Sequence, residues 1–200
     1  MKVIGITGPT GAGKTTALNA LIELGALIID ADAVYHDLTE KSEPMRKALT
    51  ERFGPVYGTD GTLDRRALGA VVFQDEKALS DLNAVTHHFV GKEIDRLLDV
   101  ARKEGKIAAA IDAIALIESG NDRKCDVLVA VIAPVELRVR RIMAREGISE
   151  EYARMRVAAQ KGEDFFRKNC DYILENDETD TPETFKARAL VLFRRILNQY

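Results

Sequence analysis

The feature that most constrains this chain is a glycine-rich stretch close to its N-terminus. Residues 3–7 form a short run rich in β-branched side chains, which favours a strand. Residues 8–16 read Gly-Pro-Thr-Gly-Ala-Gly-Lys-Thr-Thr, and residues 17–24 have the composition of a helix. The positions with the spacing of a phosphate-binding loop are Gly8, Gly13, Lys14 and Thr15. A strand, such a loop and a helix in this order predict that the chain binds a nucleotide.

A loop of this kind holds phosphate oxygens through its backbone. Its N–H groups must turn inward around the anion, and glycines recur because larger side chains would block that approach. Lys14 would place a positive charge on the β- and γ-phosphates, and Thr15 would offer its hydroxyl to Mg²⁺. A helix running on from Thr16 would point the positive end of its dipole at the anion. The predicted ATP-binding residues are Gly11, Ala12, Gly13, Lys14, Thr15 and Thr16.

Composition limits the remaining function classes. The chain has 200 residues, enough for one domain with a small insertion. Its formal net charge of −3 argues against a general nucleic-acid binder. We expect no membrane segment, because no apolar run approaches the roughly 18 residues of a span. The N-terminus leads straight into the predicted strand and is not expected to be a signal peptide. Cys125 and Cys170 have neither metal-ligand spacing nor a disulfide framework, so we expect core or near-core thiols in a reducing cytoplasm.

A pair of aspartates follows the second predicted strand, at residues 26–29. In the sequence Asp30-Ala31-Asp32, the carboxylates could serve turn chemistry and cap the next helix. Alternatively, a carboxylate at the carboxyl end of a parallel strand could accept the proton of a hydroxyl nucleophile. If the segment were extended, Asp30 and Asp32 would point the same way. Geometry alone therefore leaves both aspartates as candidates.

Residues 33 to roughly 105 have a different sequence pattern. Apolar residues recur at helical spacing and no segment has a strand pattern. We expect an all-helical insertion that covers a second substrate. His87 and His88 lie within it. Without further evidence, ordinary positions at the surface or the core edge of a helix are favoured over a functional role for them.

The second half of the chain returns to strands. Residues 106–112 predict a buried strand that ends in Asp112, an arrangement in which the aspartate holds Mg²⁺ directly or through water. Residues 125–132 are almost continuously apolar, which suits a parallel sheet covered on both faces. Residues 171–174 predict a last short strand. A final helix is expected to start at residues 181–183.

Two arginine-rich helices are predicted between these strands. The first starts near Pro134 and ends at Gly147, and the second starts at residues 149–151. The first carries Arg138, Arg140, Arg141 and Arg145. Arginine-rich helices are usually solvated faces, where ion pairs contribute little. With a phosphate-binding loop nearby, the alternative is a closing lid whose arginines stabilise a transferring phosphoryl group.

Taken together, these motifs resemble the dephospho-coenzyme A kinase family over nearly the whole chain. The matching positions are residues 7–16, 30–32, 63–65, Leu68, Phe73, 86–87, 125–126, Arg141, 145–147, Gln160 and 171–176. The phosphate-binding loop alone is generic. The Asp-Ala-Asp sequence at this distance, the Leu-Asp-Arg motif and the segment from the glutamine to the final asparagine are more specific.

The resemblance implies ATP-dependent phosphorylation of the ribose 3′-hydroxyl of dephospho-coenzyme A, with Mg²⁺ as the companion of ATP. It implies a P-loop kinase fold: a three-layer α/β/α core with a mainly parallel sheet (1–32 and 106–200), a coenzyme-A-binding helical insertion (about 33–105) and a helical lid (about 138–165). A monomer without nucleic-acid or membrane partners is expected. The implied catalytic residues are Asp32, Lys14, Arg141 and Arg145. The implied acceptor-binding residues are Asp32, Leu63, Arg65 and His87, and the implied metal ligands are Thr15 and Asp112.

Two segments depart from the family pattern. Residues 114–118 read Ile-Ala-Leu-Ile-Glu where the family usually has Pro-Leu-Leu-Phe-Glu, and His87-His88 replaces a His-Pro pair. Both lie where the second substrate is expected. The alternatives are therefore a kinase for another small hydroxyl or nucleotide acceptor, a nucleotide-gated switch, and a divergent nucleotide binder without useful catalysis. Residues 121–124 do not match the Asn-Lys-x-Asp guanine motif, which weakens the switch.

Overall fold

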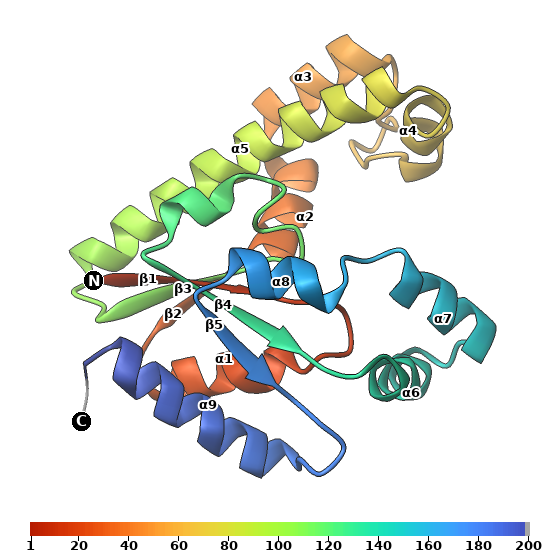
Figure 1. The fold of residues 1–200 in the computed structure, drawn as a ribbon. Helices are drawn as coiled ribbons and strands as arrows, with labels where there is room; N and C mark the ends of the chain where they lie inside the picture. Colours follow the sequence, from red (N-terminus) through yellow and green to blue (C-terminus); the bar gives the residue numbers. More distant parts are fainter. Residues whose placement is uncertain (199–200) are drawn as a thin grey trace. The chain divides into compact units, whose positions relative to one another are not determined.

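The computed structural model describes residues 1–198 and divides into two compact units. The first, here called the sheet unit, comprises Met1–Ile29 and the chain from Val100 onward. The second, here called the helical unit, is Asp30–Asp99. Figure 1 shows the elements of each unit in sequence colours. Among the described residues, no helix is long and apolar enough to cross a membrane.

A parallel sheet forms the middle of the sheet unit. Its strands are ordered β2-β3-β1-β4-β5, with bounds of Leu27–Asp30, Ala108–Asp112, Lys2–Thr7, Val127–Ile132 and Tyr172–Glu175. Strand β1 pairs in parallel with both β3 and β4, and β4 pairs in parallel with β5. Parallel neighbours need crossover connections, and helices supply them here. The predicted α/β class with a mainly parallel sheet is confirmed.

Helices cover both faces of this sheet. The sheet unit contains α1 (Lys14–Glu23), α6 (Val135–Glu146), α7 (Glu150–Ala158), α8 (Glu163–Asn169) and α9 (Pro182–Ile196), together with a short 3₁₀ helix at Asn121–Lys124. Helices α6 and α7 pack on each other. Helices α1 and α9 lie side by side on one face, and α8 lies on the other (Figure 1).

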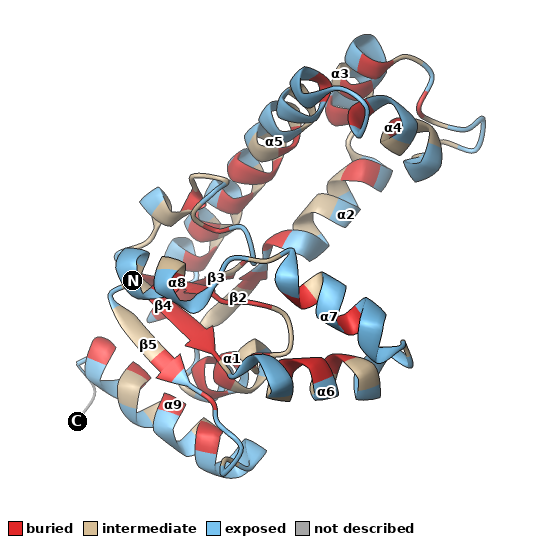
Figure 2. Ribbon diagram, turned by 45° about the vertical axis from the view of Figure 1, so that its right-hand side comes forward, coloured by how far each residue is buried: buried red, intermediate tan, exposed pale blue. Residues whose placement is uncertain are grey.

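The apolar run of β4 follows from burial on both faces of the strand. Val129 and Val131 pack into the core that α1 and α9 form, whereas Ala130 and Ile132 pack with Phe166 of α8. Successive side chains of a strand point to opposite faces, so a strand covered twice must be apolar at every position. Figure 2 shows this burial along the strand.

The helical unit has a core of its own. It contains α2 (Ala31–Lys41), α3 (Glu43–Phe53), α4 (Arg65–Val72) and most of α5 (Glu76–Lys103), whose last residues belong to the sheet unit. The predicted helical spacing of Met45, Leu49 and Phe53 is confirmed, since all three are buried in this core. Asp64 caps α4, because its carboxylate accepts from the N–H groups of Arg66 and Ala67.

Candidate active site

The phosphate-binding loop connects β1 to α1 and is tightly enclosed. Gly8, Gly11 and Gly13 have φ angles of +133°, +82° and +104°, which L-residues with side chains rarely adopt. A Cβ on Gly8 would lie 2.0 Å from the carbonyl oxygen of Val131, and one on Gly13 would lie 2.3 Å from Nδ2 of Asn176. The glycines therefore serve close backbone approach as well as left-handed geometry. Helix α1 begins at Lys14, two residues earlier than predicted, so the loop is shorter than expected.

Three consecutive carbonyl groups of the loop accept hydrogen bonds from side chains outside it. Arg138 Nε donates to Thr10 O (3.0 Å), Arg141 Nη1 donates to Gly11 O (3.3 Å), and Asn176 Nδ2 donates to Ala12 O (2.9 Å). These donors come from α6 and from the end of β5. Holding the carbonyl oxygens to the outside favours a loop conformation in which an anion meets backbone N–H groups and the N-terminus of α1.

Gln160 and Arg138 hold the tip of the loop. Gln160 Oε1 accepts from the Thr10 N–H (3.0 Å) and from Arg138 Nη2 (2.7 Å), and Gln160 Nε2 donates to Thr10 Oγ1 (2.8 Å). Arg138 is 5% exposed, and burial lowers the pKa of its guanidinium. The interpretation of α6 as a solvated face is therefore wrong for Arg138, which is a buried clamp on the loop. In the sequence, the feature that could have indicated this role was the position of Arg138 one helical turn before Arg141.

Seven of the predicted site residues line one cavity of about 280 Å³ in the sheet unit: Gly11, Gly13, Lys14, Thr15, Asp112, Arg141 and Arg145. Asp112 is the last residue of β3, and the two arginines lie on α6. Lys14 Nζ donates to Gly8 O (3.1 Å). The structure thus brings the residues predicted for phosphate and metal together from three separate elements.

The two arginines of this cavity differ in their surroundings. Arg141 is half-buried, and burial lowers the pKa of its guanidinium while the charge of Asp180 acts in the opposite direction. Its Nη2 also donates to Asn176 Oδ1 (3.2 Å). Arg145 is exposed and pairs with the neighbouring Glu146 (2.6 Å). Arg141 is therefore fixed to the loop, whereas Arg145 is held only by a surface ion pair.

The aspartate pair is not extended as expected. Asp30 ends β2 and caps α2, and its Oδ1 accepts from the N–H groups of Asp32 and Ala33 at 2.9 Å each. Asp32 lies in the first turn of that helix. The argument that both side chains point the same way is therefore wrong, because the cap turns the chain into a helix immediately. Asp30 has the capping role, and Asp32 keeps an exposed carboxylate.

The other predicted acceptor residues, Leu63, Arg65 and His87, also lie in the helical unit. Arg65 is close to His36, which was not among the predicted residues. His36 follows Asp32 by four residues on α2, which places both on one helix face. The Arg65 Nη2 atom lies 2.6 Å from His36 Nδ1, so Arg65 joins this face. Leu63 packs against the core of the unit. His87 is half-buried on α5, and burial lowers the pKa of its imidazole. Sequence reasoning missed His36, for which the i, i+4 spacing from Asp32 was the only signal.

The segment that departs from the family pattern is partly structural. Leu116 is fully buried in the sheet unit, and Ile114 O accepts from Thr7 Oγ1 (3.1 Å). Ile114 also lines the cavity that holds Lys14. The buried residue of this segment is thus the leucine that the family pattern keeps, whereas the changed Ile114 is 37% exposed and borders the candidate site.

Comparison with known proteins decides the family. A family model described as dephospho-CoA kinase matches residues 2–181, which spans both units. A dephospho-CoA kinase of Corynebacterium glutamicum is 39% identical over 197 residues, covering 98% of each chain. The chain belongs to the dephospho-CoA kinase family. The predicted family is thereby confirmed.

Solved structures agree on the fold. A dephospho-CoA kinase from Campylobacter jejuni superposes with a TM-score of 0.71 at 26% identity, covering 99% of this chain and 98% of that one. A shikimate kinase from Bacteroides thetaiotaomicron superposes with a TM-score of 0.54 at 15% identity, covering 98% of each chain. The second likeness concerns the fold alone.

Proposed function

We propose that this chain transfers the γ-phosphoryl group of ATP to the ribose 3′-hydroxyl of dephospho-coenzyme A, giving coenzyme A and ADP. The reaction of its family is the ATP-dependent phosphorylation of dephospho-coenzyme A in coenzyme A biosynthesis. The observation that carries the proposal for this chain is the single cavity that Lys14, Thr15, Asp112, Arg141 and Arg145 line. These are the residue types that phosphoryl transfer requires.

The phosphate-binding loop and Lys14 bind the triphosphate. The N-terminus of α1 offers N–H groups and a positive dipole end, and the Lys14 ammonium balances charge on the β- and γ-phosphates. Arg141 and Arg145 add positive charge at the same cavity. Phosphoryl transfer spreads negative charge over the moving group, so fixed cations there lower the barrier. Residues 138–165, which Arg138 and Gln160 join to the phosphate-binding loop, would act as a lid that excludes water, which otherwise hydrolyses the donor.

The residues present fit a magnesium ion. The Thr15 hydroxyl and the Asp112 carboxylate line the same cavity, and both are oxygen ligands of the kind that Mg²⁺ prefers. We propose that Thr15 holds the ion directly and that Asp112 holds it directly or through water. When bound, Mg²⁺ would supply charge neutralisation at the phosphate oxygens.

Asp32 is our candidate for the general base. Its carboxylate is exposed in the first turn of α2, whereas Oδ1 of Asp30 already accepts two backbone N–H groups. Asp32 would orient the 3′-hydroxyl of the acceptor and take its proton. Leu63, Arg65 and His87 would hold the rest of the acceptor, with the Arg65 guanidinium directed at its phosphate oxygens.

Acceptor-dependent release of ADP tests the proposal. The purified protein is supplied with Mg·ATP and, in separate reactions, with dephospho-coenzyme A, AMP, CMP, shikimate or no acceptor. We expect stimulation by dephospho-coenzyme A alone. Stimulation by another acceptor, or slow ADP release that no acceptor changes, would contradict the proposed substrate while leaving the fold assignment intact.

Substitution of Asp32 tests the assigned base. A general base contributes about 10²- to 10⁴-fold, so Asp32→Asn is expected to lower kcat by about that factor without weakening ATP binding. The control is Asp37→Asn, an exposed position on the same helix where Asp37 pairs with Lys41. Asp37→Asn should leave kcat nearly unchanged. Full activity of the Asp32→Asn variant would remove Asp32 from this role.

A further inference from the structure

The connection between β5 and α9, here called the β5–α9 loop (residues 176–181), lies directly behind the phosphate-binding loop. Asn176 begins it and joins three parts of the sheet unit. Its N–H donates to Ile132 O (2.8 Å), its Nδ2 donates to Ala12 O (2.9 Å), and its Oδ1 accepts from Arg141 (3.2 Å). Asn176 is 4% exposed. Any displacement of this residue would therefore disturb both the phosphate-binding loop and Arg141.

Beside Asn176 lies a cavity of about 200 Å³, separate from the one that holds Lys14. Its lining includes Gly13, Thr16 and Arg141 on one side and Asn176, Thr181 and Phe185 on the other. The β5–α9 loop thus forms a wall of a space that opens next to the start of α1. The conformation of this loop sets the shape of that wall.

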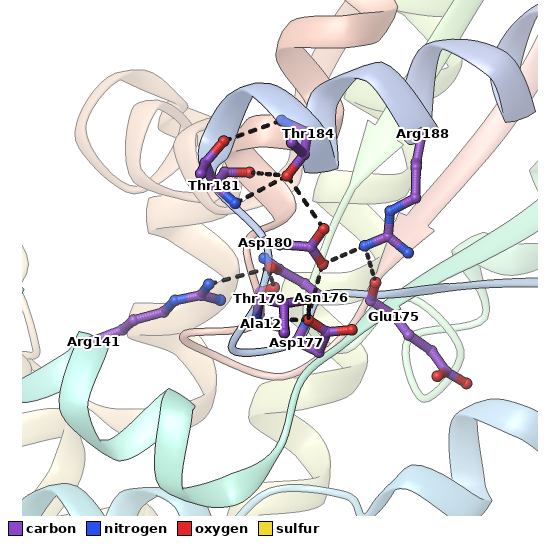
Figure 3. A network of polar contacts seen from close by, with 10 residues as sticks. All are labelled: Ala12, Arg141, Glu175, Asn176, Asp177, Thr179, Asp180, Thr181, Thr184 and Arg188. Carbon is purple, nitrogen blue, oxygen red and sulfur yellow. Dashed lines mark hydrogen bonds and ion pairs between the residues drawn. The ribbon is translucent and has the colours of Figure 1, made fainter.

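Two charged residues hold the β5–α9 loop in place (Figure 3). Asp180 Oδ2 accepts from the Asp177 N–H (3.0 Å), and Asp180 Oδ1 accepts from Thr184 Oγ1 (3.4 Å). Arg188 of α9 forms an ion pair with Asp180 and donates to Glu175 O (2.8 Å). The Asp180 side chain is only 8% exposed. The arginine therefore bridges the residue before the loop and a carboxylate inside it.

Glu178 of the loop pairs with Arg140 of α6 at the surface, whereas the contacts of Asp177, Thr179 and Thr181 are local. Asp177 Oδ1 accepts from the backbone N–H (2.8 Å) and the hydroxyl (2.6 Å) of Thr179, which makes one turn. Thr181 and Thr184 form a capping box that starts α9. Neither contact connects the turn to the helix across the loop. Asp180 and Arg188 make that connection with side chains that are 8% and 48% exposed, through hydrogen bonds between charged groups, which contribute more than those between neutral groups.

We infer that Asp180 and Arg188 are positioning residues for the nucleotide, acting through Asn176 on the phosphate-binding loop and on Arg141. The inference rests on the proposed function in that ATP is the ligand of this site. Neither residue lines the cavity that holds Lys14. Their contribution is to keep the β5–α9 loop in the one conformation in which Asn176 holds Ala12 O and Arg141 together.

The test compares Asp180→Asn and Arg188→Met with the control Lys186→Met. Lys186 is also on α9 but pairs with Glu23 of α1 (2.7 Å), away from the loop. The measurements are ATP affinity by titration calorimetry and steady-state kinetics with both substrates. We expect both loop variants to raise Kd and KM for ATP about 2- to 30-fold, the range for coupling through such networks. The kcat value and the KM for the acceptor should change less than about twofold, as should every constant of the control.

A double variant and a conservative variant separate positioning from general stability. If the two residues act as one unit, Asp180→Asn with Arg188→Met should bind ATP no more weakly than the poorer single variant. Arg188→Lys, which keeps the charge but lacks the fork, should give an intermediate Kd. Thermal unfolding of each variant shows whether it is folded at the assay temperature.

Three results would overturn the inference: unchanged ATP affinity in both single variants, fully additive losses in the double variant, or a fall in kcat with an unchanged KM for ATP. Calorimetry with ATP alone needs no acceptor. A wrong acceptor assignment would therefore leave this test intact, and a wrong positioning role would leave the acceptor test intact.

Discussion

Gly8 and Gly25 both have a left-handed backbone but differ in what surrounds them. Their φ angles are +133° and +82°, and no atom lies within 4 Å of a Cβ placed on Gly25, whereas one on Gly8 would overlap the backbone of β4. Gly25→Ala should therefore cost only the left-handed strain, about 1–2 kcal/mol of unfolding free energy. Gly8→Ala adds overpacking of about 1–3 kcal/mol and should cost about 2–5 kcal/mol in all. Urea denaturation of both variants measures the difference, and equal losses would contradict the argument.

The two aspartates mark how far single residues could be predicted. Their place after a strand identified Asp30 and Asp32 as candidates, because polar residues at the carboxyl ends of parallel strands face the site. Asp30 caps the helix because its carboxylate accepts hydrogen bonds from two N–H groups, at 2.9 Å each. These hydrogen bonds exist only once α2 has formed. Short-range sequence patterns allow both arrangements.

Within α6, arginines two positions apart have opposite environments. Arg138 is buried against Thr10 and Gln160, while Arg140 pairs with Glu178 at the surface, where both side chains are more than half exposed. Arg138→Leu removes the guanidinium that donates to Thr10 O and to Gln160 Oε1. The loss of these hydrogen bonds should lower the unfolding free energy by about 1–3 kcal/mol. Arg140→Leu removes an exposed pair and should cost at most about 1 kcal/mol. Denaturation midpoints check both values.

The same pair carries a prediction for binding. Because Arg138 fixes the tip of the phosphate-binding loop through Thr10 O, Arg138→Leu should also weaken ATP binding, measured by calorimetry at a temperature where the variant is folded. Arg140→Leu is the matched control on the same helix. If both variants bound ATP as the parent does, the clamp would be a contribution to stability alone.

Elements were predictable where periodicity is strong. The apolar run of β4 and the spacing of Met45, Leu49 and Phe53 follow from burial on two faces or on one stripe. The clamp on the loop was not predictable in this way. Gln160 is 150 positions from Thr10, and a contact over that distance depends on how α6 and the following helices fold back on β1.

At the scale of the whole molecule, the glycine-rich loop was enough to predict the sheet class, because strand, loop and helix in that order occur in parallel α/β folds. The order β2-β3-β1-β4-β5 depends on crossovers that local patterns do not encode. The β5–α9 loop shows the same limit. Asp180 and Arg188 are ordinary charged residues in the sequence, and only their meeting beside Asn176 gives them a proposed role.

Cys125 and Cys170 provide a test of how the sheet unit opens. Both are free thiols of intermediate exposure, and burial raises the pKa of Cys125 to about 12 and of Cys170 to about 11, with neighbouring aspartates acting in the same direction. Since the thiolate is the reactive form, labelling at pH 8 should be about 10²- to 10³-fold slower in the native protein than in urea.

Saturating ATP should slow this labelling further wherever opening of the sheet unit limits it, because the ligand stabilises the folded state. A Cys170→Ser variant isolates the response of Cys125. The raised pKa values also fix the sign of the pH effect. The folded state disfavours both thiolates, so their contribution to stability is complete below the unfolded pKa near 9 and is lost as the pH rises through 11 and 12. Labelling of the native protein as fast as in urea, with no protection by ATP, would contradict the prediction that burial in the sheet unit suppresses the thiolate form of both cysteines.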